Sequence, residues 1–212
     1  MAQFDMSTAD NYGGGKGSFF VLKNDKDKAQ VRFLYDGMED IKGELVHKVQ
    51  VGDKERYVSC LRTYSDPIDK CPFCAAQIKV QPRLFLKLYN EDAGEVQIWE
   101  RSKLYYQRLS GFTSRYKPLY NEIIEIERHG KAGDQQTDYQ FFPVENTPID
   151  ITDEKYECPE AVGTIILDKT ADDMHYYLEN GNFPITDSGN ANQAQSNEMP
   201  IRRTPSSSRR AF

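Results

Sequence analysis

The stretch that decides the fold is HKVQVGDKERYVSCLRTYSDPIDKCPFC, residues 47–74, which holds three of the four cysteines and one of the three histidines. Cys71 and Cys74 are separated by two residues, a spacing at which both thiolates can face one ion. His47 and Cys60 lie upstream at separations that allow a closed, four-coordinate Cys3His site, which zinc favours. The stretch therefore predicts a structural Zn²⁺ held by His47, Cys60, Cys71 and Cys74.

Other interpretations of these residues stay open. A Cys-x-x-Cys pair can be a redox couple, but that would need a preceding strand and a long following helix, whereas a polar loop, residues 66–70, comes before it. The cysteines can also be unrelated buried thiols, and His47 can be an ordinary strand histidine because its segment alternates. A catalytic zinc fits less well, since four protein ligands leave no position for water. Val49 also stands where a zinc deaminase needs glutamate.

Composition limits the classes of protein that fit. The length of 212 residues suits one domain with a tail. The net charge of −6 gives no overall attraction to nucleic acid or membrane, so a polyanion site must be local. Few cysteines in a metal-type cluster indicate a reducing cytoplasm. The start has no apolar signal segment, and no apolar run approaches the ~20 residues of a membrane helix, so we expect a cytoplasmic protein without a membrane partner.

The two ends differ from the middle of the chain. Residues 1–17 are polar and glycine-rich, which predicts a flexible arm, because the GxxxxGK[ST] pattern of a phosphate loop is absent. Residues 18–182 are the expected folded core, with a zinc subdomain at 43–80. Residues 183–212 lack the apolar content for a core and end in Arg202, Arg203, Arg209 and Arg210. A tail of opposite charge to the body suggests contact with a partner or a neighbouring copy.

Alternating apolar and polar residues predict about seven short strands in the core. One predicted hairpin turns at Gly52 and carries His47 on one arm and Cys60 on the other. The other expected elements are a hairpin over 83–101, a helix over 103–109 ended by Gly111, a long hairpin over 120–144, and a helix over 171–180 ended by Gly181 with Met174, Tyr177 and Leu178 as its packing stripe. This pattern predicts a mainly β fold, an OB-fold-like Greek-key barrel with an inserted zinc-binding loop and a few short helices.

Aromatic and basic side chains share the predicted strand faces. Since buried Arg and Lys need partners, we expect an exposed face on which rings stack on bases and cations track phosphates. The alternative is a solvated face whose aromatics reflect β propensity. The candidate contacts for single-stranded DNA are Arg83, Phe85, Lys87, Tyr89, Trp99, Arg101, Lys103, Tyr105, Tyr106, Arg115, Tyr116, Arg128 and Tyr139.

The order His47, Cys60, Cys71-Pro72-x-Cys74 resembles the zinc site of the T-even phage replicative single-stranded-DNA-binding proteins. The similarity covers roughly residues 47–144. It implies a non-enzymatic, zinc-bearing OB-fold that coats and protects single strands cooperatively in DNA replication, recombination and repair, with the four residues above as metal ligands. It also places Trp99 and Arg101 near DNA, and adds neighbouring copies and replication proteins as partners.

The chain departs from that family at its ends. Relatives have a basic N-terminal arm and an acidic C-terminal tail, whereas this arm is glycine-rich and this tail ends basic. We expect the tail to reach a neighbouring copy or the DNA. Two other functions compete: a zinc-ribbon module for protein interaction or transcription, and a zinc hydrolase or nuclease. For the enzyme, Asp150, Asp153 and Glu154 are near in sequence, but nothing in the sequence places them around a metal.

Overall fold

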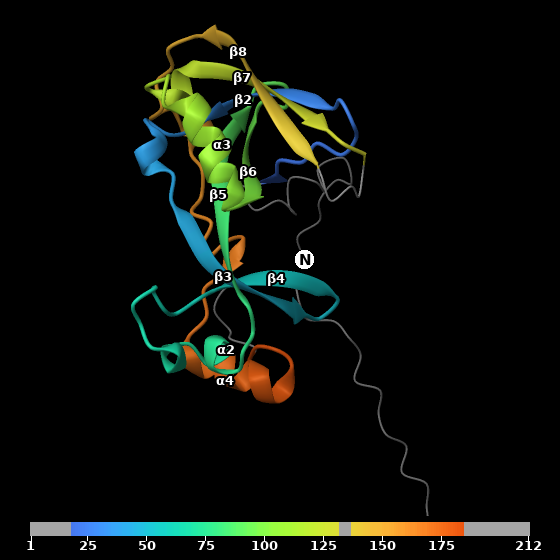
Figure 1. Cartoon of the computed structure of the whole chain (residues 1–212), viewed down its shortest axis with the longest axis vertical. Coiled ribbons are helices and arrows are strands. Elements are labelled where there is room, and N and C mark those ends of the chain that lie inside the picture. Colours follow the sequence, from blue (N-terminus) through green and yellow to red (C-terminus); the bar gives the residue numbers. More distant parts are fainter. Residues whose placement is uncertain (1–17, 132–136, 185–212) are drawn as a thin grey trace, which may run out of the picture.

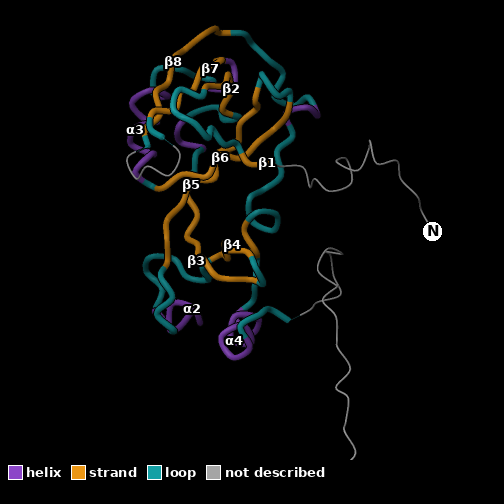
Figure 2. Tube along the Cα trace, turned by 90° about the vertical axis from the view of Figure 1, so that its right-hand side faces the viewer, coloured by secondary structure: helices purple, strands orange, loops and turns teal. Residues whose placement is uncertain are grey.

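The computed structural model describes residues 18–131 and 137–184, and it has two lobes joined by the strands β3 (Gly43–Val51) and β5 (Val80–Asn90) (Figure 1). Figure 2 shows the same division after a quarter turn, with helices α2 and α4 in the smaller lobe. The predictions of a flexible arm at 1–17 and of a disordered basic tail fall outside the described residues, apart from residues 183 and 184.

The larger lobe contains most of the strands and one helix. Its elements are β1 (Ser18–Phe19), β2 (Lys28–Phe33), η2 (Met38–Asp40), β6 (Glu95–Ser102), α3 (Leu104–Thr113), η4 (Leu119–Asn121), β7 (Glu122–His129) and β8 (Asp138–Asn146). Its core packs buried side chains of β2, β5 and β7 around Trp99 of β6. Alternation predicts these strands because residues two apart share one face.

The strands form one nine-stranded sheet in the order β8-β7-β2-β5-β3-β4-β9, with β6 paired to β5 and β1. The mainly β class is therefore confirmed. The OB-like barrel is not confirmed because the sheet is not closed: within the described ranges, β8 pairs with β7 alone. The long β5 pairs with β3 through its first half and with β2 through its last residues, which splays the sheet into two lobes.

The smaller lobe is built on the predicted β3–β4 hairpin. Its other elements are β4 (Lys54–Ser59), η3 (Ile68–Lys70), α2 (Pro72–Ala75), β9 (Ile166–Leu167) and α4 (Ala171–Asn180). Gly52 has φ +58° and turns the hairpin, and Gly181 ends α4 with φ +73°, both conformations that suit glycine. The predicted stripe on α4 is partly wrong: Met174 is fully buried, whereas Leu178 is 39% exposed.

The predicted end of the helix at Gly111 is also wrong. Gly111 keeps a helical conformation, and α3 continues to Thr113, whose hydroxyl donates to the carbonyl of Leu109 at 2.8 Å. Glycine only permits a left-handed stop, and here the buried Leu109 and Thr113 hold the last turn against the core.

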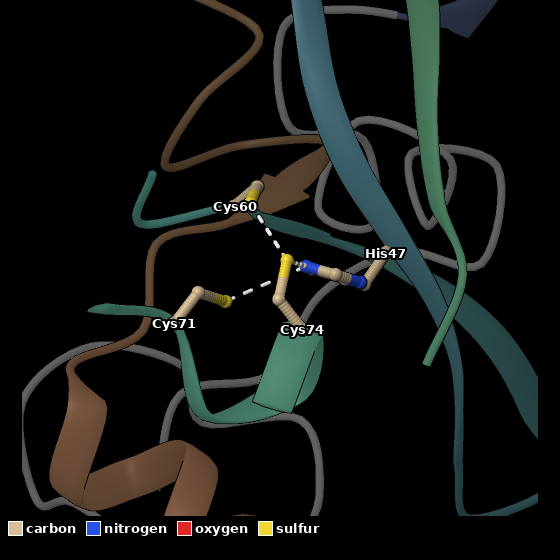
Figure 3. A group of neighbouring side chains, drawn as sticks. All are labelled: His47, Cys60, Cys71 and Cys74. Carbon is tan, nitrogen blue, oxygen red and sulfur yellow. Dashed lines mark hydrogen bonds between the residues drawn. The ribbon is translucent and has the colours of Figure 1, made fainter. Parts of the chain in front are cut away.

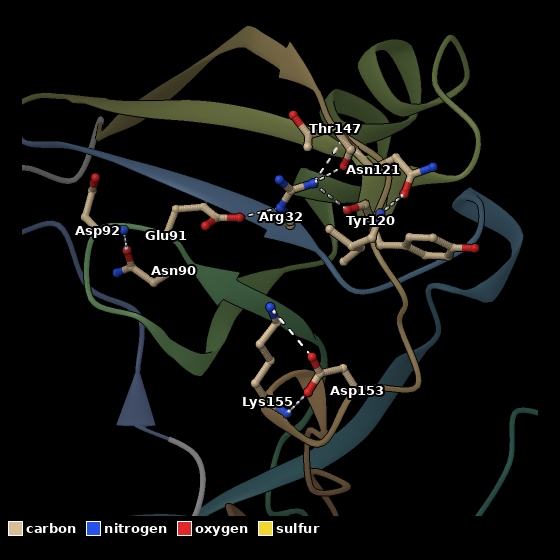
Figure 4. Close-up of polar contacts among 10 residues, drawn as sticks. Arg32, Asn90, Glu91, Asp92, Tyr120, Asn121, Thr147, Asp153 and Lys155 are labelled. Atoms are coloured by element: carbon tan, nitrogen blue, oxygen red, sulfur yellow. Dashed lines mark hydrogen bonds and ion pairs between the residues drawn. The ribbon is translucent and has the colours of Figure 1, made fainter.

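Residues 147–165 form an interlobe strap that leads from β8 to β9 and includes η5 (Glu154–Tyr156). Arg32, only 4% exposed, fixes its first residue: Nη1 donates to the carbonyls of Tyr120 (3.1 Å), Asn121 (3.1 Å) and Thr147 (2.8 Å) (Figure 4). Farther along, Ala161 joins a small core cluster with Val46, Phe85, Ile98 and Ile166. The strap therefore crosses the sheet face of β5 and β6.

Candidate metal centre and nucleic-acid interface

Four side chains meet in the smaller lobe with geometry suited to a metal ion. The ligand atoms of His47, Cys60, Cys71 and Cys74 all lie within 4.8 Å of one another. His47 Nε2 is 3.5 Å from Cys71 Sγ and 3.6 Å from Cys74 Sγ, and Cys60 Sγ is 3.6 Å from Cys74 Sγ (Figure 3). The sequence predicted all four residues, and the structure brings all four together.

The local fold explains why these side chains converge. His47 lies in β3 and Cys60 directly follows β4, so the hairpin brings them together, while Cys71 caps α2 and Cys74 lies within it. The buried ring of His47 uses Nδ1 to donate to the carbonyl of Ile78 at 3.1 Å, which turns Nε2 toward the sulfurs. Such a second contact is typical of metal-binding histidines and argues against an ordinary strand histidine.

The pKa values of three of these groups are shifted by their surroundings in the fold. Burial raises the pKa of Cys60 to about 12, with the neighbouring thiols adding to the effect. Burial also lowers the pKa of His47. At Cys71 burial acts to raise the pKa, but backbone N–H donors of Leu61, Cys74 and Phe73 outweigh it and lower the value. A bound cation would favour the thiolate at each cysteine and the neutral imidazole.

The redox interpretation of the Cys-x-x-Cys pair fits the structure poorly. All four cysteines are free thiols, and α2 is a four-residue helix rather than the long helix of a redox couple. The closest sulfur to Cys74 named above belongs to Cys60, not to its Cys-x-x-Cys partner. The unrelated-thiol interpretation fails for three of the cysteines, whereas Cys158 lies apart, packed against the small cluster of the strap.

Helix α4 covers this candidate centre, a contact that the sequence did not predict. Met174 Sδ lies 3.9 Å from Cys71 Sγ. The buried ring of Phe73 packs edge-on against His47 and Tyr177, each at 5.5 Å between ring centroids. The sequence predicted the helix and its stop at Gly181, and the structure adds a capping box at Thr170, but nothing in the sequence linked the helix to a site a hundred residues upstream.

The predicted DNA-binding face of β5 is covered by the chain itself. Phe85 is 6% exposed, Lys87 pairs with Glu160 of the strap at 2.5 Å, and Tyr89 packs edge-on against Tyr156 at 4.9 Å. Arg83 pairs with Glu100 at 3.0 Å. The prediction of an open stacking face here is therefore wrong for Phe85, and the other three side chains already have partners on the protein.

Trp99 is fully buried, so the prediction that it stacks on a base is wrong. Cross-strand pairing sets Trp99 opposite Leu86, on the core face of the sheet. Its ring packs against Phe20 at 5.7 Å and Tyr139 at 5.2 Å. Tyr139, at 7% exposure, is closed to a base for the same reason. Alternation placed Trp99 and Arg101 on one face of their strand, but it did not indicate that the core covers Trp99 on that face.

Arg128 also has a structural role in place of the predicted DNA contact. Its guanidinium donates to the carbonyl of Leu22 at 3.1 Å, to the Tyr139 hydroxyl at 3.2 Å and to Thr137 Oγ1 at 3.0 Å. It also donates to the backbone carbonyls of Gly130 and Lys131. These bonds hold the base of the β7–β8 hairpin and use most of the donors that a phosphate would need.

The remaining candidates gather on and beside α3. Lys103 and Arg115 are exposed, Tyr106 is 41% exposed, and Tyr105 and Tyr116 are half-buried. Two half-buried rings that the sequence analysis missed join them: Phe112 packs against Tyr116 at 5.1 Å and against Phe141 at 5.9 Å. We call Tyr105, Phe112, Tyr116 and Phe141 the α3–β8 aromatic cluster. A signal existed, since Phe112 lies one helical turn from Arg108 and Tyr116, but the predicted helix ended too early to show it.

Arg101 lies beneath this cluster. Its guanidinium carbon is 4.3 Å from the ring centroids of Trp99 and Tyr139 and 5.4 Å from that of Tyr105. Arg108 lies over the outer side of Tyr105 at 5.6 Å and forms an ion pair with Asp138. Basic groups and rings are therefore interleaved on this side of the larger lobe.

No protein-family model matches the chain, and no curated protein matches it either. Among the described residues, no helix combines the length and the apolar character needed to cross a membrane.

Proposed function

We propose that this chain is a non-enzymatic, sequence-independent single-stranded-DNA-binding protein with a structural zinc ion. The observation that carries the proposal is the α3–β8 aromatic cluster, in which Arg101 and Arg108 lie over a half-buried ring, with the exposed Arg115 next to Tyr116 in the chain. Rings of this kind stack on any base, and the cations beside them neutralise phosphates. The net charge of −6 makes such a local concentration of arginines necessary for binding a polyanion.

Zinc is the ion that fits the ligand set best. With Zn–S bonds of about 2.3 Å and tetrahedral angles, neighbouring ligand atoms lie roughly 3.6–3.8 Å apart. Three of the six separations, at 3.5 and 3.6 Å, are close to this geometry, and all six are within 4.8 Å. Three cysteines and one histidine complete four-coordination, so the ion would stabilise the smaller lobe and have no open position for catalysis.

In this proposal the protein coats and protects single strands, with neighbouring copies beside it, as the resemblance to phage replication, recombination and repair proteins implies. A role for the basic tail in contacting replication proteins, a neighbouring copy or the DNA belongs to the same proposal. Deletion of residues 184–212 should weaken affinity or cooperativity, and unchanged affinity and cooperativity would remove the tail from the proposal.

The test is a titration of the full chain with oligo-dT at two salt concentrations, in which tyrosine and tryptophan fluorescence report binding. We expect binding without sequence preference that weakens steeply with salt. Tyr116→Ala, which removes a ring of the cluster, should weaken it about 5–150-fold, the equivalent of ~1–3 kcal/mol per stacked base. Tyr64→Ala is the matched control, because Tyr64 is 98% exposed and outside the cluster. No binding by the zinc-loaded protein would reject the proposal.

A protein-interaction module is the second candidate, favoured by one observation. Tyr64 and Ile68, at 98% and 60% exposure, project from the loop between Cys60 and Cys71. Exposed apolar side chains on a metal-braced loop suit a protein partner. In the titration, absent DNA binding with zinc retained would favour this function.

A further inference from the structure

Arg101 stands out because it is a desolvated cation with no acidic partner. Arg32, Arg83 and Arg108 each form an ion pair with a carboxylate. Arg101, enclosed by rings, forms none with any described residue, and its Nη1 donates instead to the carbonyl of Glu100 at 3.0 Å. Removing a cation from water without a counter-ion is costly, so the fold must keep this charge for a reason.

Two buried donors beside this charge also have no partner. Arg101 Nε and Trp99 Nε1 are both shielded from solvent and make no hydrogen bond. Burial lowers the pKa of Arg101, and the opposing effects of Tyr139, Tyr105 and Glu100 do not outweigh it. Most buried donors in proteins are satisfied, so unsatisfied ones at one place indicate a missing acceptor.

We propose that Arg101 is a phosphate-binding subsite, walled by Trp99, Tyr105 and Tyr139, that anchors the backbone of a bound single strand. A guanidinium fork matches the oxygens of a phosphate, and an anion there gives the uncompensated charge its counter-ion. This subsite deepens the proposed DNA-binding function by identifying which cation holds the strand beneath the aromatic cluster.

The arrangement also explains how one tryptophan can report on binding without touching a base. Trp99 is the only tryptophan in the chain, and the Arg101 guanidinium lies 4.3 Å from its ring centroid. An anion on Arg101 changes the electric field at the indole, so occupancy of the subsite is expected to change Trp99 emission.

The first part of the test titrates the full, zinc-loaded chain with inorganic phosphate and follows Trp99 emission, with sodium chloride at equal ionic strength as the comparison. We expect a saturable change with phosphate that chloride does not reproduce. Arg101→Gln should raise the midpoint at least tenfold. Arg83→Gln should leave it unchanged, since Arg83 also lies over a ring, Tyr57 at 6.0 Å, but is paired with Glu100.

The second part measures oligo-dT binding against salt on the same proteins. Losing one phosphate contact should lower the slope of log affinity against log salt by about one for Arg101→Gln and not for Arg83→Gln. If Arg101→Gln does not fold, Arg101→Lys keeps the charge but not the fork and should still weaken phosphate binding measurably.

The outcomes separate the subsite from the proposed function. No phosphate-specific change in Trp99 emission, or an unchanged midpoint in the folded Arg101 variants, overturns the subsite even where oligo-dT binds. Phosphate binding that depends on Arg101 in a protein that ignores oligo-dT upholds an anion site and rejects the DNA-binding function.

Discussion

Removing the metal should unfold the smaller lobe and leave the larger lobe folded. The smaller lobe buries four apolar side chains almost completely, Val49, Val58, Phe73 and Met174, which contribute about 6–12 kcal/mol. Ordering the four residues of α2 and the ten residues of α4 costs about 14–28 kcal/mol. Burial thus falls short of the ordering cost by about 8–16 kcal/mol, which is close to the ~10–16 kcal/mol that structural zinc supplies in small domains. The larger lobe has its own core and needs no ion.

The assay for this prediction follows both lobes during titration with a chelator. Amide hydrogen exchange should show loss of protection across α2 and α4, whereas the emission maximum of Trp99, buried in the larger lobe, should stay constant. Cys74→Ser should reproduce the effect without chelator. Cys158→Ser is the matched control, because that thiol lies outside the ligand set and the variant should keep its metal.

Two results would refute this reasoning. If Trp99 emission shifts to the red with the same midpoint as the loss of protection in α4, the lobes unfold as one unit. If α4 stays protected after the metal is gone, the apolar contacts of Phe73 and Met174 suffice and the ion is not structural.

Three further predictions follow from buried side chains. Arg32→Met should destabilise the fold by about 3–5 kcal/mol in thermal unfolding, because three carbonyls and Glu91 lose a buried partner. The control Arg56→Met, at an exposed position, should leave the stability nearly unchanged. Phe73→Ala should cost about 3–5 kcal/mol and speed the loss of metal to a chelator, since the ring supports His47; equal metal retention would contradict this. Burial raises the pKa of Tyr35 from 10 to about 12. The neutral phenol therefore stabilises the fold fully below pH 10, and about 3 kcal/mol of the free energy of unfolding is lost as the pH rises toward 12. Tyr35→Phe should remove that part of the alkaline destabilisation in denaturant titrations.

The metal centre could be predicted from the sequence because its information is local. His47 and Cys60 belong to one hairpin, and Cys71 and Cys74 to one short turn, so neighbouring backbone geometry nearly determines where the ligand atoms lie. The same holds for the glycine turns at Gly52 and Gly181. Short-range rules are sufficient wherever the partners are close along the chain.

The candidate nucleic-acid interface could be predicted only in part, because exposure is a long-range property. Strand alternation grouped Phe85 with Lys87 and Trp99 with Arg101 within each strand, but it does not say that the two groups lie on opposite faces of the sheet or what covers each face. Phe85 is buried under Ala161 and Ile166, about eighty residues downstream. Trp99 is enclosed by rings that include Phe20, directly after β1, and Phe141 of β8. The rings that stay partly accessible belong instead to the α3–β8 aromatic cluster.

The interlobe strap connects the larger lobe to the hairpin of the candidate metal centre. Its first end is fixed by Arg32 in the larger lobe, and its last residues pass into β9, which pairs with β4 of the hairpin that positions His47 and Cys60. Ile166 of β9 also packs in the cluster that covers Phe85. Because the Arg32 anchor and the α3–β8 aromatic cluster lie in the larger lobe, loss of the metal should loosen only the distal end of the strap. We therefore expect metal-free protein to keep binding oligo-dT through Arg101 while the strap end near β9 becomes open to protease; loss of binding together with metal would place the interface on the smaller lobe instead.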